Sequence, residues 1–246
     1  MRRILWAWIS LFDLNGRFYK LLKTQRPVYD VVALTGTKIA YLSYQFEEGG
    51  PARRNTGLQS VPRTTRVVLK DIENGNERVV LSRKIPSDFI MMKAGGSFSF
   101  GIDLRGGVII ARSADGNLAV GVSNSPNVEI YDLEGKPLRS FALKNQARPA
   151  TPDYIDRFKK AQIAAIRTDS QMPSAIRNEI IELGQTDLSA MFDRMLPYYS
   201  EMLTDTDGNF LFFSWGEEPG RSALDFSVVR NDDSAGRPPS RSLSHR

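Results

Sequence analysis

Short runs of β-forming residues alternate with tight turns along most of the chain. The clearest example spans residues 127–143, where an apolar run at 128–131 and a second run at 138–143 flank a polar turn at 132–136. Gly135 supplies a residue that adopts positive φ at little cost, as a turn of this kind requires. The pattern predicts a β-hairpin.

The hairpin pattern recurs. Residues 9–20 align with residues 128–139 without a gap, and residues 67–75 match them with one extra residue before the glycine. Residues 203–210 keep the turn and the apolar run that follows it. The predicted structural turn residues are Asp13, Gly16, Asp71, Gly75, Asp132, Gly135, Asp207 and Gly208.

Two interpretations fit these matches: unrelated hairpins with similar turns, or a radial β-repeat. The first three turn aspartates are 58 and 61 residues apart, and this near-constant spacing favours the repeat. Each unit would be a small antiparallel sheet that cannot bury both faces alone and therefore stacks on its neighbours.

The motif aromatic-Asp-Leu-x-Gly-basic at residues 12–17 and 131–136, with Asp-x-Asp-Gly-Asn at 205–209, resembles six-bladed β-propellers of the NHL-repeat and TolB-like kind. The resemblance implies an all-β fold of four-stranded antiparallel blades. About three and a half to four blades would be present, with a helical insertion near residues 152–195. Residues 1–230 would form one partial, N-terminally incomplete propeller domain, and residues 231–246 a disordered tail.

The apolar runs predict individual strands. The expected strands are 29–34, 38–46, 64–72 and 78–83 in one unit, 98–104, 108–113, 118–123 and 128–143 in the next, and finally 210–215 and 223–230. Residues 47–63, rich in Gly, Pro and Arg, are expected to form an irregular excursion between strands of the first unit.

After residue 150 the apolar spacing becomes helical. Thr151 can cap a helix that begins at Pro152, residues 174–183 continue the helical spacing as far as Gly184, and a short helix is expected over 187–195. These helices are predicted to pack on one face of the sheets; a partner-binding helical arm is the alternative.

The first residues resemble a signal peptide in charge and apolar character, but no small-residue cleavage site follows. The apolar run is far shorter than the roughly 20 residues of a membrane span, so no transmembrane segment is expected. Residues 9–20 already belong to the repeat, so we expect the chain to begin inside a blade. Two interpretations follow: the chain is a fragment of a six-bladed ring, which is favoured, or two chains complete each other by self-association. The family resemblance favours an extracytoplasmic location, periplasmic or secreted.

The net charge of +5 comes mostly from arginines at the two ends of the chain, and the body is nearly neutral. Arg53, Arg54, Arg63 and Arg66 form the only local basic cluster, which is interpreted as a solvated loop. A phosphate-binding surface would need basic residues clustered on the body, so no nucleic-acid partner is expected.

The chain has no cysteine, and its single histidine is His245 in the tail. A body without either residue cannot build Ser-His-Asp or Cys-His catalysis, and zinc sites usually need such ligands. Asp205 and Asp207 are weak metal candidates, because the glycine comes fourth rather than sixth as in a calcium loop. No catalytic residue and no cofactor is predicted.

The sequence favours a non-enzymatic binding or scaffold module, with an unknown protein or a small-molecule or carbohydrate ligand at the channel mouth or on the helical face. The alternative is a carboxylate- and metal-dependent hydrolase or lyase in the central channel. A set of aromatic residues either lines a ligand groove or, more in keeping with a repeat fold, packs between blades: Trp6, Trp8, Tyr198, Tyr199 and Trp215.

Overall fold

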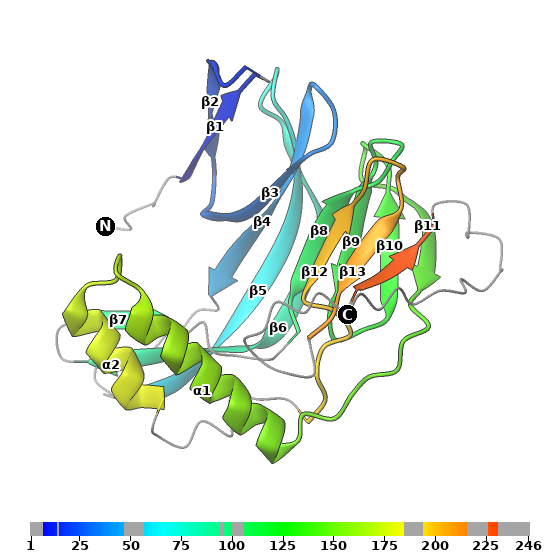
Figure 1. Cartoon of the computed structure of the whole chain (residues 1–246). Helices are drawn as coiled ribbons and strands as arrows, with labels where there is room; N and C mark the ends of the chain where they lie inside the picture. The colour runs from blue at the N-terminus through cyan, green and yellow to red at the C-terminus, as the bar shows by residue number, and fades with distance from the viewer. Residues whose placement is uncertain are drawn as a thin grey trace.

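The computed structural model describes residues 7–13, 15–46, 57–93, 96–99, 106–184, 194–215 and 226–230. These residues form four antiparallel sheets that follow one another along the chain, with two helices between the third sheet and the fourth (Figure 1). Within each sheet, consecutive strands are hydrogen-bonded neighbours. The mostly β, antiparallel character expected from the sequence is therefore confirmed.

The first sheet contains β1 (Ala7–Phe12) and β2 (Phe18–Thr24). The second contains β3 (Val28–Ala33), β4 (Lys38–Phe46), β5 (Gly57–Asp71), β6 (Glu77–Lys93) and β7 (Gly96–Ser99). The third contains β8 (Val108–Arg112), β9 (Leu118–Val122), β10 (Asn127–Tyr131) and β11 (Pro137–Ala142). The fourth contains β12 (Glu201–Thr204), β13 (Phe210–Phe213) and β14 (Phe226–Val229).

The sheets stack face to face in chain order, and a separate apolar core fills each of the three interfaces. Between the first and second sheets lie Ile9, Leu22, Ile39, Tyr41, Val68 and Ile72. Between the second and third lie Leu34, Ala40, Leu42, Val67, Leu69, Val108, Ile110, Leu118, Val120 and Tyr131. Between the third and fourth lie Ala111, Ala119, Val128, Ile130, Leu143, Tyr199, Met202, Phe210 and Phe212.

A middle sheet is thus buried on both faces, which explains its nearly continuous apolar strands. In β4, Ile39 and Tyr41 point toward the first sheet, whereas Ala40 and Leu42 point toward the third. Successive side chains of a strand lie on opposite faces, so four consecutive apolar residues contribute to two cores. Each fully buried large side chain stabilises the fold by roughly 1.5–3 kcal/mol.

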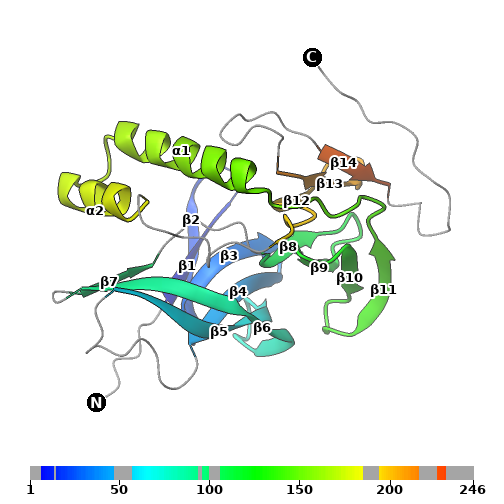
Figure 2. The ribbon, with the colours of Figure 1, turned by 90° about the horizontal axis from the view of Figure 1, so that it is seen from below.

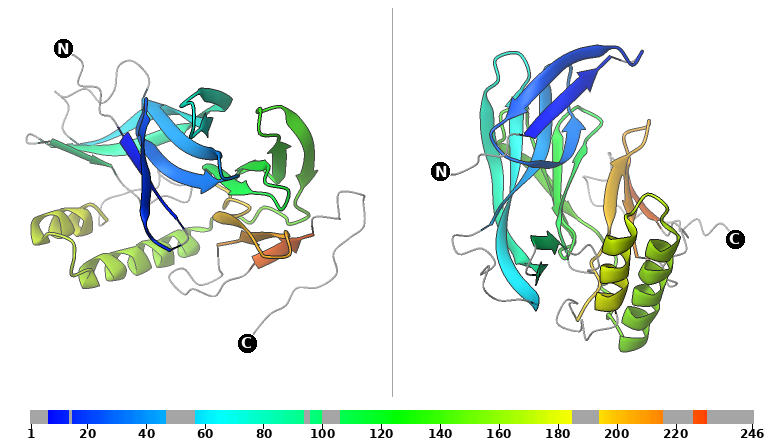
Figure 3. Two further views of the ribbon diagram at one scale, coloured as in Figure 1. Left: turned by 90° about the horizontal axis from the view of Figure 1, so that it is seen from above. Right: turned by 90° about the vertical axis from the view of Figure 1, so that its left-hand side faces the viewer.

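The first strands of the second, third and fourth sheets lie next to one another. β8 contacts both β3 and β12, so these three strands form the meeting line from which the sheets diverge. Seen from below and from above, the sheets spread outward from this line (Figures 2 and 3).

Lysine side chains connect consecutive sheets at their tight turns. Lys20 of β2 donates from Nζ to the carbonyl of Ile72, 2.6 Å away, in the turn between β5 and β6. Lys38 of β4 donates to the carbonyl of Leu133, 3.0 Å away, in the turn between β10 and β11, and also pairs with Glu134. Both accepting carbonyls belong to the residue directly after a turn aspartate.

Two of the three predicted helices are confirmed: α1 (Pro152–Thr168) and α2 (Ser174–Gly184). Thr151 caps α1 by accepting a hydrogen bond from the backbone N–H of Tyr154. Only the first turns of α1 bury large side chains, where Phe158 meets the ring of Trp215 edge to face. The helices lie at the end of the molecule opposite the tight turns (Figure 1). Neither described helix combines the length and the apolar character needed to cross a membrane.

Other expectations need correction. The long hairpin of β5 and β6 replaces part of the excursion expected over 47–63, since β5 already begins at Gly57. Of the strand expected over 98–104, residues 100–104 lie outside the described residues, and residues 98–99 belong to β7, which pairs with β6 and so belongs to the second sheet. The excursion was expected to reach residue 63 because proline is unfavourable inside a β-ladder. In the structure the register of β5 and β6 skips Pro62 and Pro86, so both prolines lie outside the ladder of paired residues.

Arg63 and Arg66 consequently lie in β5 and not in a loop, and the guanidinium of Arg63 lies 4.0 Å from the centre of the Tyr44 ring. Arg53, Arg54, the tail at 231–246 and most of the helix expected over 187–195 fall outside the described residues.

One glycine permits the contact between the third and fourth sheets. Gly121 of β9 faces the buried ring of Tyr199, and a Cβ at this position would lie 2.0 Å from Tyr199 Oη and 3.1 Å from Cζ. Among the described residues the Tyr199 hydroxyl has no hydrogen-bond partner, and burial raises the pKa of this group. The Tyr199 ring therefore fits between the third and fourth sheets only because residue 121 is a glycine.

We expect Gly121→Ala to lower the free energy of unfolding by about 2–3 kcal/mol, because the added methyl group overpacks a filled interface. Urea unfolding measures the change. Adding Tyr199→Phe should recover part of the loss, since it removes both the closest atom and an unpaired buried hydroxyl.

Gly36→Ala is the matched control, because a Cβ at Gly36 meets nothing within 4 Å. Equal destabilisation by Gly36→Ala and Gly121→Ala would contradict the close approach to Tyr199.

Candidate functional site

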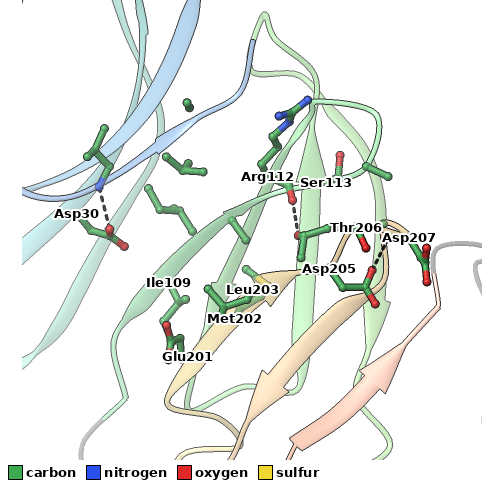
Figure 4. Close-up of a pocket in the computed structure, with 18 residues that line it drawn as sticks. Asp30, Ile109, Arg112, Ser113, Glu201, Met202, Leu203, Asp205, Thr206 and Asp207 are labelled. Carbon is green, nitrogen blue, oxygen red and sulfur yellow. Dashed lines mark hydrogen bonds between the residues drawn. The ribbon is translucent and has the colours of Figure 1, made fainter. Parts of the chain in front are cut away.

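A cavity of about 610 Å³ lies where β3, β8 and β12 meet. Its wall is made by these three strands and by the turns that follow β8 and β12 (Figure 4). The lining residues that carry charge are Asp30, Arg112, Glu201, Asp205 and Asp207. The apolar lining includes Val31, Ile109, Ile110, Met202 and Leu203.

The strands at the cavity are fixed to one another through backbone and core. Thr204 donates its hydroxyl hydrogen to the carbonyl of Arg112, which joins the end of β12 to the end of β8. Ile110 and Met202 belong to the cores on either side of the third sheet. The Asp30 carboxylate accepts a hydrogen bond of 2.8 Å from the next backbone N–H, that of Val31. The cavity therefore has a rigid wall with exposed charged groups on it.

The predicted turn residues form a second, structural set. In three turns, Oδ1 of the aspartate accepts hydrogen bonds from the N–H groups two and four residues later: Asp13, Asp132 and Asp205. Asp71 accepts from the N–H groups of Glu73 and Asn74, in agreement with its longer turn. The glycines of all four turns have positive φ: Gly16, Gly75, Gly135 and Gly208.

This arrangement leaves little coordination capacity in Asp205, one of the two weak metal candidates. Asp205 Oδ1 accepts two backbone bonds, and its Oδ2 accepts 2.9 Å from the side-chain amide of Asn209. Asp207 is exposed at the cavity rim. Within the described ranges, no group of three or more acidic, His or Cys side chains is placed to hold a metal ion. His245 lies outside those ranges.

Hydrogen bonds from the turns stabilise the charged form of three aspartates. Backbone N–H donors lower the pKa of Asp71, chiefly that of Asn74, and the pKa of Asp132, chiefly that of Lys136. The pKa of Asp205 is lowered first by the side-chain amide of Asn209. The cause in each case is a donor aimed at a carboxylate oxygen.

The aromatic candidates separate into two groups. Tyr199 is buried in the core, Tyr198 is partly buried beside that core, and Trp215 packs on α1. Trp8 is more than half exposed on β1, and Trp6 lies outside the described residues. None of the four described side chains in this set lines the cavity.

Sequence reasoning singled out turns, so of the residues that line the cavity it named Asp205, Asp207 and Gly208 and missed the charged residues on the strands. Asp30, Arg112 and Glu201 carry no motif of their own. What these three residues share is their place in the fold. Each lies in the first strand of its sheet, one to five residues before the turn that ends that strand. Finding this shared place required the strand order, and β12 itself was not expected as a separate strand.

Comparisons with known proteins found no match to a family model, to a curated protein or to a solved structure.

Three turn aspartates, Asp71, Asp132 and Asp205, predict an acid-sensitive fold. The pKa of each is lower in the folded protein than in the unfolded chain, so their contribution to stability is present above the ordinary aspartate pKa of about 3.9. It is lost as the pH falls below that value toward the lower folded pKa. Urea unfolding between pH 7 and pH 3 should show this decline.

The triple variant Asp71→Asn, Asp132→Asn, Asp205→Asn keeps an accepting Oδ1 at each turn but cannot titrate, so the decline below pH 4 should become shallower. Asp115→Asn is the control, because its turn is capped by Ser113, which accepts from the N–H of Asn117. An unchanged slope in the triple variant would refute the role of the turn carboxylates.

Proposed function

We propose that this chain is a β-propeller module that binds a small ligand in the cavity lined by β3, β8 and β12. The radial stacking of meander sheets on their first strands supports a propeller arrangement. The observation that carries the binding proposal is the cavity itself, because its volume lies within the roughly 300–1,000 Å³ of small-molecule sites.

The polar groups of the cavity favour a ligand rich in hydroxyl groups. Asp30, Glu201 and Asp207 offer carboxylate oxygens that accept hydrogen bonds, and the Arg112 guanidinium offers donors. A hydroxyl group both donates and accepts, so one polyhydroxylated molecule can satisfy all of these groups. The apolar side chains of Ile109 and Leu203 provide surface for the less polar face of a sugar ring. A carbohydrate is therefore the proposed ligand class.

We expect thermal melting against a panel of mono- and disaccharides to identify at least one sugar that raises the melting temperature. Binding to the folded state alone stabilises it by about 2.7 kcal/mol at a ligand concentration 100 times Kd. Glu201→Gln and Arg112→Ala should each raise Kd about tenfold, equivalent to about 1.4 kcal/mol.

Glu73→Gln removes an exposed carboxylate in the turn between β5 and β6, away from the cavity, and should leave Kd unchanged. The proposal fails if no sugar stabilises the protein, or if stabilisation survives both cavity variants.

Calcium chloride tests the metal-dependent alternative. We expect millimolar calcium to leave the melting temperature unchanged, because Asp205 is already committed to its turn and the described carboxylates form no ligand group. A rise in melting temperature that Asp30→Asn or Asp207→Asn abolishes would instead support a metal-dependent hydrolase or lyase in this cavity.

A further inference from the structure

The first sheet has one buried face and one exposed face. Ile9 and Leu22 point into the core shared with the second sheet. Five large side chains occupy the opposite face and one end of the hairpin, and we call them the leading face. They are Trp8, Phe12, Phe18, Tyr19 and Leu21, with exposed fractions of 53%, 59%, 61%, 68% and 46%. Five such neighbours on one two-stranded sheet form an exposed apolar patch of the kind that marks interaction surfaces.

The fourth sheet, at the other end of the stack, repeats this asymmetry. Met202, Phe210 and Phe212 point into the core shared with the third sheet. The strand alternation puts Leu203, Leu211 and Val228 on the opposite side, and the strand register places the three side by side. Leu203 is 45% exposed, and Leu211 and Val228 are partly exposed. We call these three residues the trailing face.

The two faces carry opposite charge. The hairpin of β1 and β2, residues 7–24, contains three basic residues and one acidic residue; Lys20 donates to Ile72 of the second sheet, whereas Lys23 lies opposite Trp8 in the strand register. The fourth sheet, described over 201–213 and 226–230, contains three acidic residues and one basic residue, Arg230, and Glu201 shares the side of Leu203. Contact between two leading faces would bring like charges together, whereas contact between a leading and a trailing face brings opposite charges together.

Apolar stacking of one sheet on another already occurs three times inside the molecule, between each sheet and the next. The leading face lies where a preceding sheet would stack, and the trailing face where a following sheet would stack. Two copies contribute eight sheets, which is within the four to eight typical of closed radial arrays.

We propose that the leading face binds the trailing face of a second copy of this chain, and that two copies close head to tail. Each copy then contributes both faces, so two equivalent contacts form and no end face stays exposed. The contact is heterologous, which makes closure the alternative to an open filament. Leu203 and Glu201 also line the cavity, but the association proposed here needs no bound ligand and is measured without one.

Sedimentation velocity of the full chain over a range of concentrations tests the proposal. We expect a species of about 55 kDa, twice the 27.6 kDa of one chain. The double variant Tyr19→Lys, Leu21→Lys removes apolar surface from the leading face without changing its sign of charge, and Leu203→Glu does the same to the trailing face. Each should weaken association at least about tenfold.

Leu138→Glu is the matched control, because Leu138 is 54% exposed on β11 and belongs to neither face; this variant should associate normally. Mixing the two face variants provides the decisive observation. The leading-face variant keeps an intact trailing face and the trailing-face variant keeps an intact leading face, so the mixture should form dimers that neither variant forms alone. Recovery in the mixture also shows that both variants are folded.

A wild-type protein that stays monomeric at all concentrations would overturn the proposal. Loss of association in the leading-face variant alone, with no recovery on mixing, would overturn it in favour of contact between two leading faces. A ladder of masses above the dimer would keep the head-to-tail contact and overturn closure by two copies.

Discussion

The structure depends on one repeated interaction, the burial of a sheet face against the next sheet in the chain. No described sheet is large enough to form a core alone, and each core is shared by two sheets. The middle sheets therefore need apolar residues on both faces, as in residues 39–42 of β4. The position of β3, β8 and β12 follows from the same stacking, and so does the cavity that they line.

Local chemistry made much of the fold predictable. The turn at 132–136 needs an aspartate to accept backbone N–H groups and a glycine with positive φ, and Asp132 and Gly135 meet both needs. Thr151 and Pro152 likewise determine the start of α1 within a few residues. Such signals involve only four or five consecutive residues, so they can be recognised without knowledge of the rest of the chain.

Longer-range features were not predictable in the same way. The Gly-, Pro- and Arg-rich composition of residues 47–63 suggested an irregular excursion, yet Pro62 lies within β5, where a register irregularity opposite Pro86 accommodates both prolines. The cavity combines Asp30, Arg112 and Glu201 from three different sheets, and no local pattern distinguishes these residues from other surface charges. β7 also belongs to the second sheet because it pairs with β6, and nothing in the sequence of β7 itself indicates that pairing.

The lysine bonds between sheets have a consequence for how the repeats can diverge. Lys20 and Lys38 both donate to a main-chain carbonyl, that of Ile72 and that of Leu133. Every amino acid provides such a carbonyl, so the acceptor constrains the path of the turn and leaves its side chain unspecified. Neighbouring repeats can therefore drift apart in sequence at the acceptor position while the connection between them persists. A fold joined in this way can retain its architecture long after the similarity among its units has faded to a few aspartates and glycines.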